Sequence, residues 1–337
     1  MVEIVHNPRL IQTDLPVCAS EGYLKSAAKT YGWFVSPEFI LPFYTLNRAF
    51  TRHMIFTSGP VKNTPATTIQ QEKAFLTDVV ARCRRMAVDV ISQPKTTALF
   101  TTYPDGAICI PWGCYQVDLL KSEDELFSRL HASRRRVIRK AEREGVCIFR
   151  GPEHINACHR LIVRTLERQG RPGIPHAQLA AYQEHLPLNV SFYLACHNRA
   201  DHACAVLVHD SETAFYIHGG SCTTPHHGAA SLLHWTAMRD MKCRGLKTYN
   251  FVGGRIRPVK GSKQEFIQLF KSRFGTTFTS GYLWKYPLSP WKHSLYRTYN
   301  RFKGLARGKY HYEDIIDNEI RTGSMEKSTL INNALRT

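Results

Sequence analysis

The sequence lacks several features that would set it apart from ordinary globular domains. It has ten cysteines but no C-x-x-C pair, and no stretch approaches 18 consecutive apolar residues. The first absence excludes a disulfide or zinc motif of that kind and favours reduced, buried thiols. The second predicts that no helix spans a membrane. Residues 1–10 have no apolar signal-peptide core, so we expect a cytoplasmic protein.

Acidic residues are scarce relative to basic ones. The chain has 45 Lys and Arg against 27 Asp and Glu, a formal net charge of +18. This excess favours polyanionic partners such as nucleic acid, a sugar nucleotide or an anionic lipid surface. A hydrophobic fraction of 43% supports packed cores, and 337 residues are enough for two domains.

Hydrophobic periodicity predicts a mixed α/β chain with helices on the faces of mixed sheets. Short strands are expected between residues 33 and 61, where Pro42 indicates an edge or bent strand. Further strands are predicted at 98–102, 107–117, 190–195, 203–209, 213–217, 247–252 and 277–284, and helices at 69–92, 122–144, 153–168, 177–185, 228–242 and 263–274.

A basic run dominates the middle of the chain. Six Lys or Arg fall within residues 134–143. On a helix, Arg136, Arg139 or Lys140, and Arg143 lie on neighbouring turns, which makes a positive stripe suited to phosphate. A solvated helix face is the alternative, and we weigh the two equally.

The segments Tyr249–Gly254 and Phe270–Gly275 carry the clearest chemical signal. The first is a short strand that ends in Gly253 and Gly254, where a backbone can approach a ligand closely. The second is a helix end with Lys271 between aromatic residues and Arg273 nearby. We expect the helix at 263–274 to bury Phe266, Ile267, Leu269, Phe270 and Phe274. A cation beside bare amides suits acyl transfer on an anionic substrate. The alternative is an ordinary surface lysine.

A glycine- and histidine-rich stretch precedes the helix predicted at 228–242. Amides of Gly219–Ser221 or of the helix start at Gly228 are candidates to hold a phosphate or an oxyanion, and a plain connecting loop is equally compatible. His218, Cys222, His226 and His227 have superficially ligand-like spacing. Glycines and Pro225 prevent a regular helix there, so we predict no metal site.

Three ordered motifs resemble the Fem-type peptidoglycan-bridge aminoacyltransferases and their GNAT-fold relatives. Arg134–Ala141 with Gly145-Val146 is similar to the family's arginine and I-R-K-A helix, and Gly245–Gly254 to its G-x-x-x-Y-D-F-G-G segment. Phe270-Lys271 with Phe274-Gly275 is similar to its F-K-x-x-F-G helix end. Order and spacing agree over about residues 118–284. Asn250 stands where the family usually has Asp, and the acyl-CoA glycine pattern Q/R-x-x-G-x-G/A of ordinary acetyltransferases is absent.

The resemblance implies two GNAT-like domains, at 1–118 and 119–288, followed by a basic aromatic tail at 289–337. It implies transfer of an acyl or aminoacyl group to an amine of a cell-envelope or exopolysaccharide precursor. No bound cofactor is expected, and the donor is acyl-CoA or aminoacyl-tRNA. Expected partners are an anionic small-molecule or glycan acceptor, tRNA and the inner membrane surface.

Site residues follow from the resemblance and from the motifs themselves. Lys271 is expected near the acceptor phosphate or the reacting carbonyl, and His218 is the candidate proton acceptor. The full expectation is a catalytic set of Lys271, His218 and Asn250, and a substrate-binding set of Arg136, Arg139, Lys140, Arg143, Tyr249, Gly253, Gly254 and Arg273.

A second hypothesis is a binding module without catalysis. Residues 291–309 contain six Lys or Arg and no acid, interleaved with aromatic residues. Such a segment, together with the basic stripe, would tether the protein to anionic lipid or to RNA. Residues 316–337 are polar and expected to fray.

Overall fold

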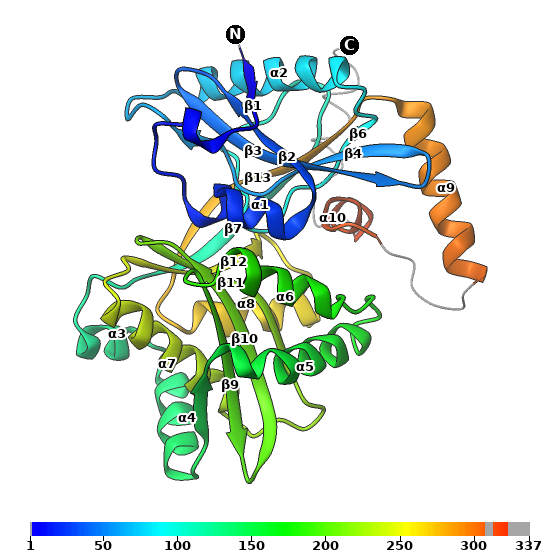
Figure 1. Cartoon of the computed structure of the whole chain (residues 1–337). Helices are drawn as coiled ribbons and strands as arrows, with labels where there is room; N and C mark the ends of the chain where they lie inside the picture. The colour runs from blue at the N-terminus through cyan, green and yellow to red at the C-terminus, as the bar shows by residue number, and fades with distance from the viewer. Residues whose placement is uncertain (1, 307–312, 323–337) are drawn as a thin grey trace. The chain divides into compact units, whose positions relative to one another are not determined.

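The computed structural model describes residues 2–306 and 313–322 (Figure 1). Its contacts divide the chain into two compact units. The first contains residues 1–113, 253–265 and 280–337, and the second contains residues 114–252 and 266–279. The first unit therefore includes segments that the sequence suggested for the second domain and the tail. No helix in the described ranges is long and apolar enough to cross a membrane.

The first unit is a sheet with helices on both faces. Trp33 and Phe34 of β2 illustrate the alternation, since Trp33 packs with Leu24 of α1 and Phe34 packs in the cluster of α2. The strand order is β1-β2-β3-β4-β6-β13, with β5 beside β3. The elements are β1 (Glu3–Val5), α1 (Glu21–Ala27), β2 (Thr30–Val35), β3 (Phe39–Arg48), β4 (Thr51–Phe56), β5 (Val61–Lys62), α2 (Ile69–Arg85), β6 (Val90–Ile91), α9 (Pro290–Ala306) and α10 (Ile315–Thr322).

Pro42 does not mark an edge strand, which was one of the two predicted alternatives. It lies in β3, which pairs with β2 on one side and with β4 and β5 on the other. Pairing with β5 covers Phe39 and Ile40, and pairing with β4 begins at Phe43. The proline thus falls between two ladders, where its missing N–H costs no hydrogen bond.

Two further predictions for this unit are wrong. Residues 98–102 form no strand, because only Phe100 makes a bridge, to Tyr282. Residues 316–322 are not frayed, because α10 buries Ile316 fully. Asp314 and Asp317 flank that contact and both pair with the buried Lys285, at 2.7 and 2.6 Å. Residues 307–312 and 323–337 of the predicted tail lie outside the described residues.

The second unit is also a sheet between helices. Tyr193 and Ala205 face α7, whereas Cys204 faces α5, so α4 and α7 cover one face and α5 the other (Figure 1). The strand order is β12-β11-β10-β9-β8. The elements are α3 (Glu123–Arg129), α4 (Ala132–Arg143), β8 (Cys147–Arg150), α5 (Ile155–Glu167), α6 (His176–His185), β9 (Val190–His197), β10 (Ala200–His209), β11 (Thr213–Ser221), α7 (Ala229–Cys243) and α8 (Lys263–Ser272, of which 266–272 belong here).

Three strands, β7 (Ile108–Asp118), β12 (Thr248–Arg255) and β13 (Thr277–Pro287), contribute residues to both units. Local signals account for many boundaries in the second unit. Ser122 caps α3 in a capping box with Glu125, and Gly145 follows α4 with a φ of 79°. β11 and β12 are parallel neighbours, but they pair only between Thr213–Phe215 and Thr248–Asn250.

Gly220 permits the close packing of α5 on β11. A Cβ added there would lie 2.4 Å from the backbone carbonyl carbon of Leu161. We therefore expect Gly220→Ala to lower the free energy of unfolding by about 1–3 kcal/mol, because backbone cannot yield as a side chain can. Urea denaturation measures this. Gly245→Ala, where nothing lies within 4 Å but φ is 87°, isolates the backbone cost alone. Equal unfolding midpoints for Gly220→Ala and the parent would contradict the packing argument.

Candidate active site

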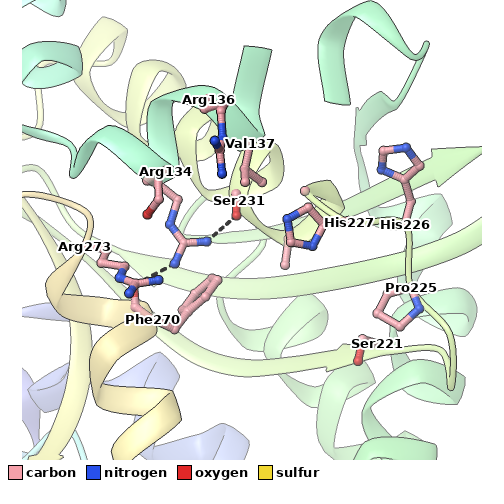
Figure 2. Close-up of a pocket in the computed structure, with 13 residues that line it drawn as sticks. Arg134, Arg136, Val137, Ser221, Pro225, His226, His227, Ser231, Phe270 and Arg273 are labelled. Atoms are coloured by element: carbon pink, nitrogen blue, oxygen red, sulfur yellow. Dashed lines mark hydrogen bonds between the residues drawn. The ribbon is translucent and has the colours of Figure 1, made fainter. Parts of the chain in front are cut away.

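A cavity of about 490 Å³ opens in the second unit at the start of α7 (Figure 2). Helix α4 contributes Arg134 and Arg136, and the segment after β11 contributes His226 and His227. Arg273 follows α8 and lines the same cavity. The wall is therefore rich in positive charge and in groups that donate hydrogen bonds, which suits an anionic ligand. The lining residues are Ser133, Arg134, Arg136, Val137, Ser221, Pro225, His226, His227, Gly228, Ala230, Ser231, Phe270 and Arg273.

Gly228 brings the basic helix and the start of α7 together. It is the N-cap of α7 with a φ of 120°, and it has no side chain to cap the helix. A Cβ there would lie 2.8 Å from the Val137 carbonyl oxygen of α4. Because the first amides of a helix point outward and carry partial positive charge, the cavity gains a backbone anion site beside the arginines.

Arg134 is the most firmly positioned cation in the cavity, although the sequence analysis did not select it. Its guanidinium donates to Ser231 Oγ and to the Phe270 carbonyl oxygen, and it lies 4.4 Å above the Phe270 ring (Figure 2). Burial, with a contribution from Arg273, lowers its pKa to about 10. The guanidinium thus stays charged at neutral pH and is held next to a second cation.

The other predicted basic residues separate into two groups. Arg136 and Arg273 line the cavity. Arg139, Lys140 and Arg143 are exposed and do not line it. The guanidinium of Arg139 lies over the ring of Phe127, and Lys140 pairs with Glu144. Arg134 could have been found from the sequence, because it lies four residues before Ile138 and seven before Ala141, the two buried residues of α4.

Lys271 is buried, unlike an ordinary surface lysine. Its side chain on α8 is among the few buried there, and its Nζ donates to the Val252 carbonyl oxygen at 3.4 Å. Burial lowers the pKa of Lys271 to about 8. A desolvated ammonium at a strand end can polarise a carbonyl or stabilise an oxyanion.

Of the five apolar residues predicted to be buried on this helix, Phe274 is buried and Phe270 is half-buried, but the other three are exposed. Phe266 is 62% exposed, and Ile267 and Leu269 are exposed as well. Gln268 and Lys271, three residues apart, are buried instead. Since burial of polar groups costs free energy, a helix with its polar side inward is typical of a functional surface.

Asn250 holds the strand end opposite Lys271. Its Oδ1 accepts a hydrogen bond from the Val252 amide at 2.7 Å, and its side chain contacts the Cys114 thiol. Val252 has a φ of 50°, which is unfavourable for a β-branched residue. Asn250 therefore binds the amide of the strained Val252, and Lys271 binds its carbonyl oxygen. Strained residues held in this way are often found at active sites.

His234 on α7 was missed by the sequence analysis. It is buried among aromatic rings, and its Nδ1 hydrogen-bonds to the Tyr249 hydroxyl at 2.8 Å. Burial, together with the charges of Arg134 and Lys271, lowers its pKa to about 3, so the ring is neutral. Tyr249 is fully buried, and its phenol belongs to the core of this unit.

Lys271, Asn250 and Tyr249 do not line the cavity, and the remaining predicted site residues do not line it either. His218 is within β11, and its ring lies 6.0 Å from that of Tyr182 on α6, outside the cavity lining. Gly219 and Gly220 also belong to β11, which extends further than predicted. At Gly253 a Cβ would lie 2.6 Å from the Trp112 ring, so the absence of a side chain at Gly253 leaves room for the Trp112 indole. Gly254 is buried in β12.

The histidines near the cavity form a hydrogen-bonded cluster. His226 Nε2 lies 2.9 Å from Glu144 Oε2, and its backbone amide donates to His202 Nδ1. The His197 ring lies 4.6 Å from that of His226. Within residues 2–306 and 313–322, no three His, Cys, Asp or Glu side chains are arranged to hold a metal ion.

Comparison with known proteins now defines the fold family. Residues 128–257 match the acetyltransferase (GNAT) domain family. The solved structure of FemX aligns with a TM-score of 0.63 at 12% identity, covering 87% of this chain and 99% of FemX. A conserved protein of unknown function from Bacteroides thetaiotaomicron aligns with a TM-score of 0.50 at 12% identity, covering 78% and 88%. No curated protein matches.

These identities are low, so the structural likeness concerns the fold. Within the second unit, the GNAT match includes α4, most of β12 and the residues that line the cavity, except Phe270 and Arg273. The GNAT-like character of the first unit stays a prediction. Residues 128–257 therefore match a GNAT acetyltransferase domain, and the chain shares the fold of FemX, in agreement with the resemblance that its sequence motifs indicated.

Proposed function

We propose that this protein is an N-acyl- or aminoacyltransferase that acts on an amine of a cell-envelope or exopolysaccharide precursor. The observation that carries the proposal is the cavity at the start of α7, where Arg134, Arg136 and Arg273 line a 490 Å³ space beside a helix N-terminus that has no capping side chain. Three guanidinium groups and a helix N-terminus suit a phosphate-bearing substrate. Acyl-CoA, aminoacyl-tRNA and a phosphorylated glycan acceptor all carry such phosphate groups.

The transfer itself requires an amine to attack an ester or thioester carbonyl. Negative charge then develops on the carbonyl oxygen, and a preorganised cation lowers the barrier most effectively. Lys271 is suited to that role because its ammonium is buried and held at the Val252 carbonyl. Asn250 is a positioning residue in this proposal, because its amide oxygen fixes the Val252 N–H.

The attacking amine must also lose a proton. His234 is neutral and buried, but its Nδ1 is engaged with Tyr249. His218 remains the sequence-based candidate for this step. A substrate group can equally accept the proton, since the reaction expels a thiolate or an alkoxide.

Turnover assays would test the proposal. Purified protein is incubated with an acyl-CoA or an aminoacyl-tRNA and with amine-bearing envelope precursors, and the acceptor is analysed by mass spectrometry. A mass increase equal to one acyl or aminoacyl group supports the proposal and identifies the donor. Failure of every donor to transfer or to stabilise the protein in a thermal-shift assay would contradict it.

Arginine variants connect the cavity to the phosphate-bearing ligand. We expect Arg134→Gln and Arg273→Gln each to weaken binding of the active donor or acceptor about 10- to 100-fold, because a charge-assisted hydrogen bond contributes about 1.5–3 kcal/mol. Isothermal titration calorimetry measures the change. Arg239→Gln on α7 is the matched control, because Arg239 is exposed and pairs with Glu123. Equal weakening by the control would contradict a specific role for the cavity.

A further inference from the structure

Helix α9 carries an exposed apolar face that the proposed chemistry does not use. Trp291, Leu295 and Phe302 are 64%, 52% and 68% exposed. With Tyr299 they follow the spacing i, i+4, i+8, i+11, which confines them to an arc of about 80° on one side of the helix. Such a stripe normally faces a protein core, but these side chains face solvent.

The side of α9 next to this stripe anchors the helix to the first unit. The ring of Tyr296 lies 4.8 Å from that of His53 in β4, and Lys292 pairs with Asp89 at 2.8 Å. Phe50, in the turn between β3 and β4, is half exposed, and its ring lies 6.3 Å from that of Tyr299. It extends the exposed apolar face beyond the helix.

The charged residues of α9 itself have one sign. No Asp or Glu occurs between Glu265 and Glu313, whereas α9 itself contains Lys292, Arg297, Arg301 and Lys303. Asp89 forms an ion pair with Lys292 and so neutralises one of these charges. A helix with an apolar stripe that includes tryptophan, and with basic but no acidic residues, has the chemistry of an in-plane helix at an anionic lipid surface.

We infer that α9 docks this protein on an anionic membrane surface, with Trp291, Leu295, Tyr299 and Phe302 inserted at the level of the lipid headgroups. An aliphatic residue within the stripe favours lipid over RNA, since single-stranded RNA binds mainly through aromatic stacking and basic grooves. The inference does not rest on the proposed acyl transfer, because α9 contributes no residue to the cavity in the second unit.

Tryptophan fluorescence gives a direct test. Of the five tryptophans, Trp33, Trp112, Trp235 and Trp284 are buried, and Trp291 alone is exposed. We expect vesicles of phosphatidylcholine and phosphatidylglycerol to shift the emission to the blue, and lipids brominated on their acyl chains to quench it. Trp291→Phe should abolish both signals while vesicle binding persists.

Vesicle flotation with surface variants completes the experiment. Leu295→Ser with Phe302→Ser should weaken binding at least about ten-fold, because two apolar side chains are lost from the bilayer. Leu188→Ser, at an 85% exposed position in the second unit, is the matched control and should bind like the parent. Added salt should weaken binding and phosphatidylcholine alone should bind poorly, because each basic residue near the surface contributes.

Several outcomes would overturn the inference. One is the absence of binding to anionic vesicles, and another is binding without quenching of Trp291. A third is equal weakening by Leu188→Ser and the α9 variant. A fourth is loss of tRNA affinity in the α9 variant when neither the parent nor the variant binds vesicles. That result would show that the helix binds RNA. Circular dichroism of each variant checks that its fold is intact.

Discussion

Replacing Lys271 by methionine should reduce acyl transfer by about 10²- to 10³-fold, the usual effect of removing one oxyanion donor. Methionine retains most of the buried volume but removes the ammonium that donates to the Val252 carbonyl. The loss should appear in kcat, because the cation acts where charge develops in the transition state. Single-turnover assays measure it.

The pKa of Lys271, lowered to about 8 by burial, gives a second readout that a structural role would not produce. If the protonated amine stabilises the oxyanion, the rate should fall as pH rises through about 8. In Lys271→Arg that alkaline limb should disappear, since a guanidinium stays protonated over this range.

Lys247→Ala removes an exposed lysine that pairs with Glu212 and serves as the matched control for activity. The role of Lys271 would be refuted if Lys271→Met retained the parent rate while its melting temperature was also unchanged. If Lys271→Met loses both its activity and its fold, the pH profile of Lys271→Arg decides whether Lys271 stabilises the oxyanion.

Acidification from pH 7.5 to 4 should destabilise the protein by several kcal/mol. Burial lowers the pKa of His53 and His209 to about 4, and that of His234 to about 3. The unfolded chain takes up protons near pH 6.5, whereas the native chain does not until these lower values. The stabilisation that comes from keeping these histidines neutral is therefore fully present above pH 6.5. It is lost as pH falls, which lowers the free energy of unfolding by roughly 2–3 kcal/mol for each fully buried ring.

Urea denaturation at pH 7.5 and pH 4 measures this loss as a decrease in the midpoint concentration. His234→Gln can keep a hydrogen bond to Tyr249 but cannot titrate. It should be less stable than the parent at pH 7.5, yet lose less stability on acidification. Identical midpoints for the parent at the two pH values would show that these rings are not buried in neutral form.

The sequence alone determined most of the secondary structure and indicated the fold. α5 and α7 were predicted to within about two residues, because their apolar periodicity is long and regular. The capping box of Ser122 and Glu125 and the glycine at 145 mark helix ends through local hydrogen bonding and backbone conformation. Motif order over 118–284 indicated the GNAT and Fem-like resemblance that the comparisons support.

Only the tertiary structure decided which side of α8 faces inward and what lies against the buried side of α4. α4 turns Arg134 toward the cavity, away from the exposed Arg139 and Arg143, and α8 buries Lys271 while exposing Phe266. The reason is that periodicity records the spacing of side chains along one helix, whereas burial depends on which distant segment packs against it. The strained Val252 and the neutral His234 likewise arise from contacts between residues far apart in the chain.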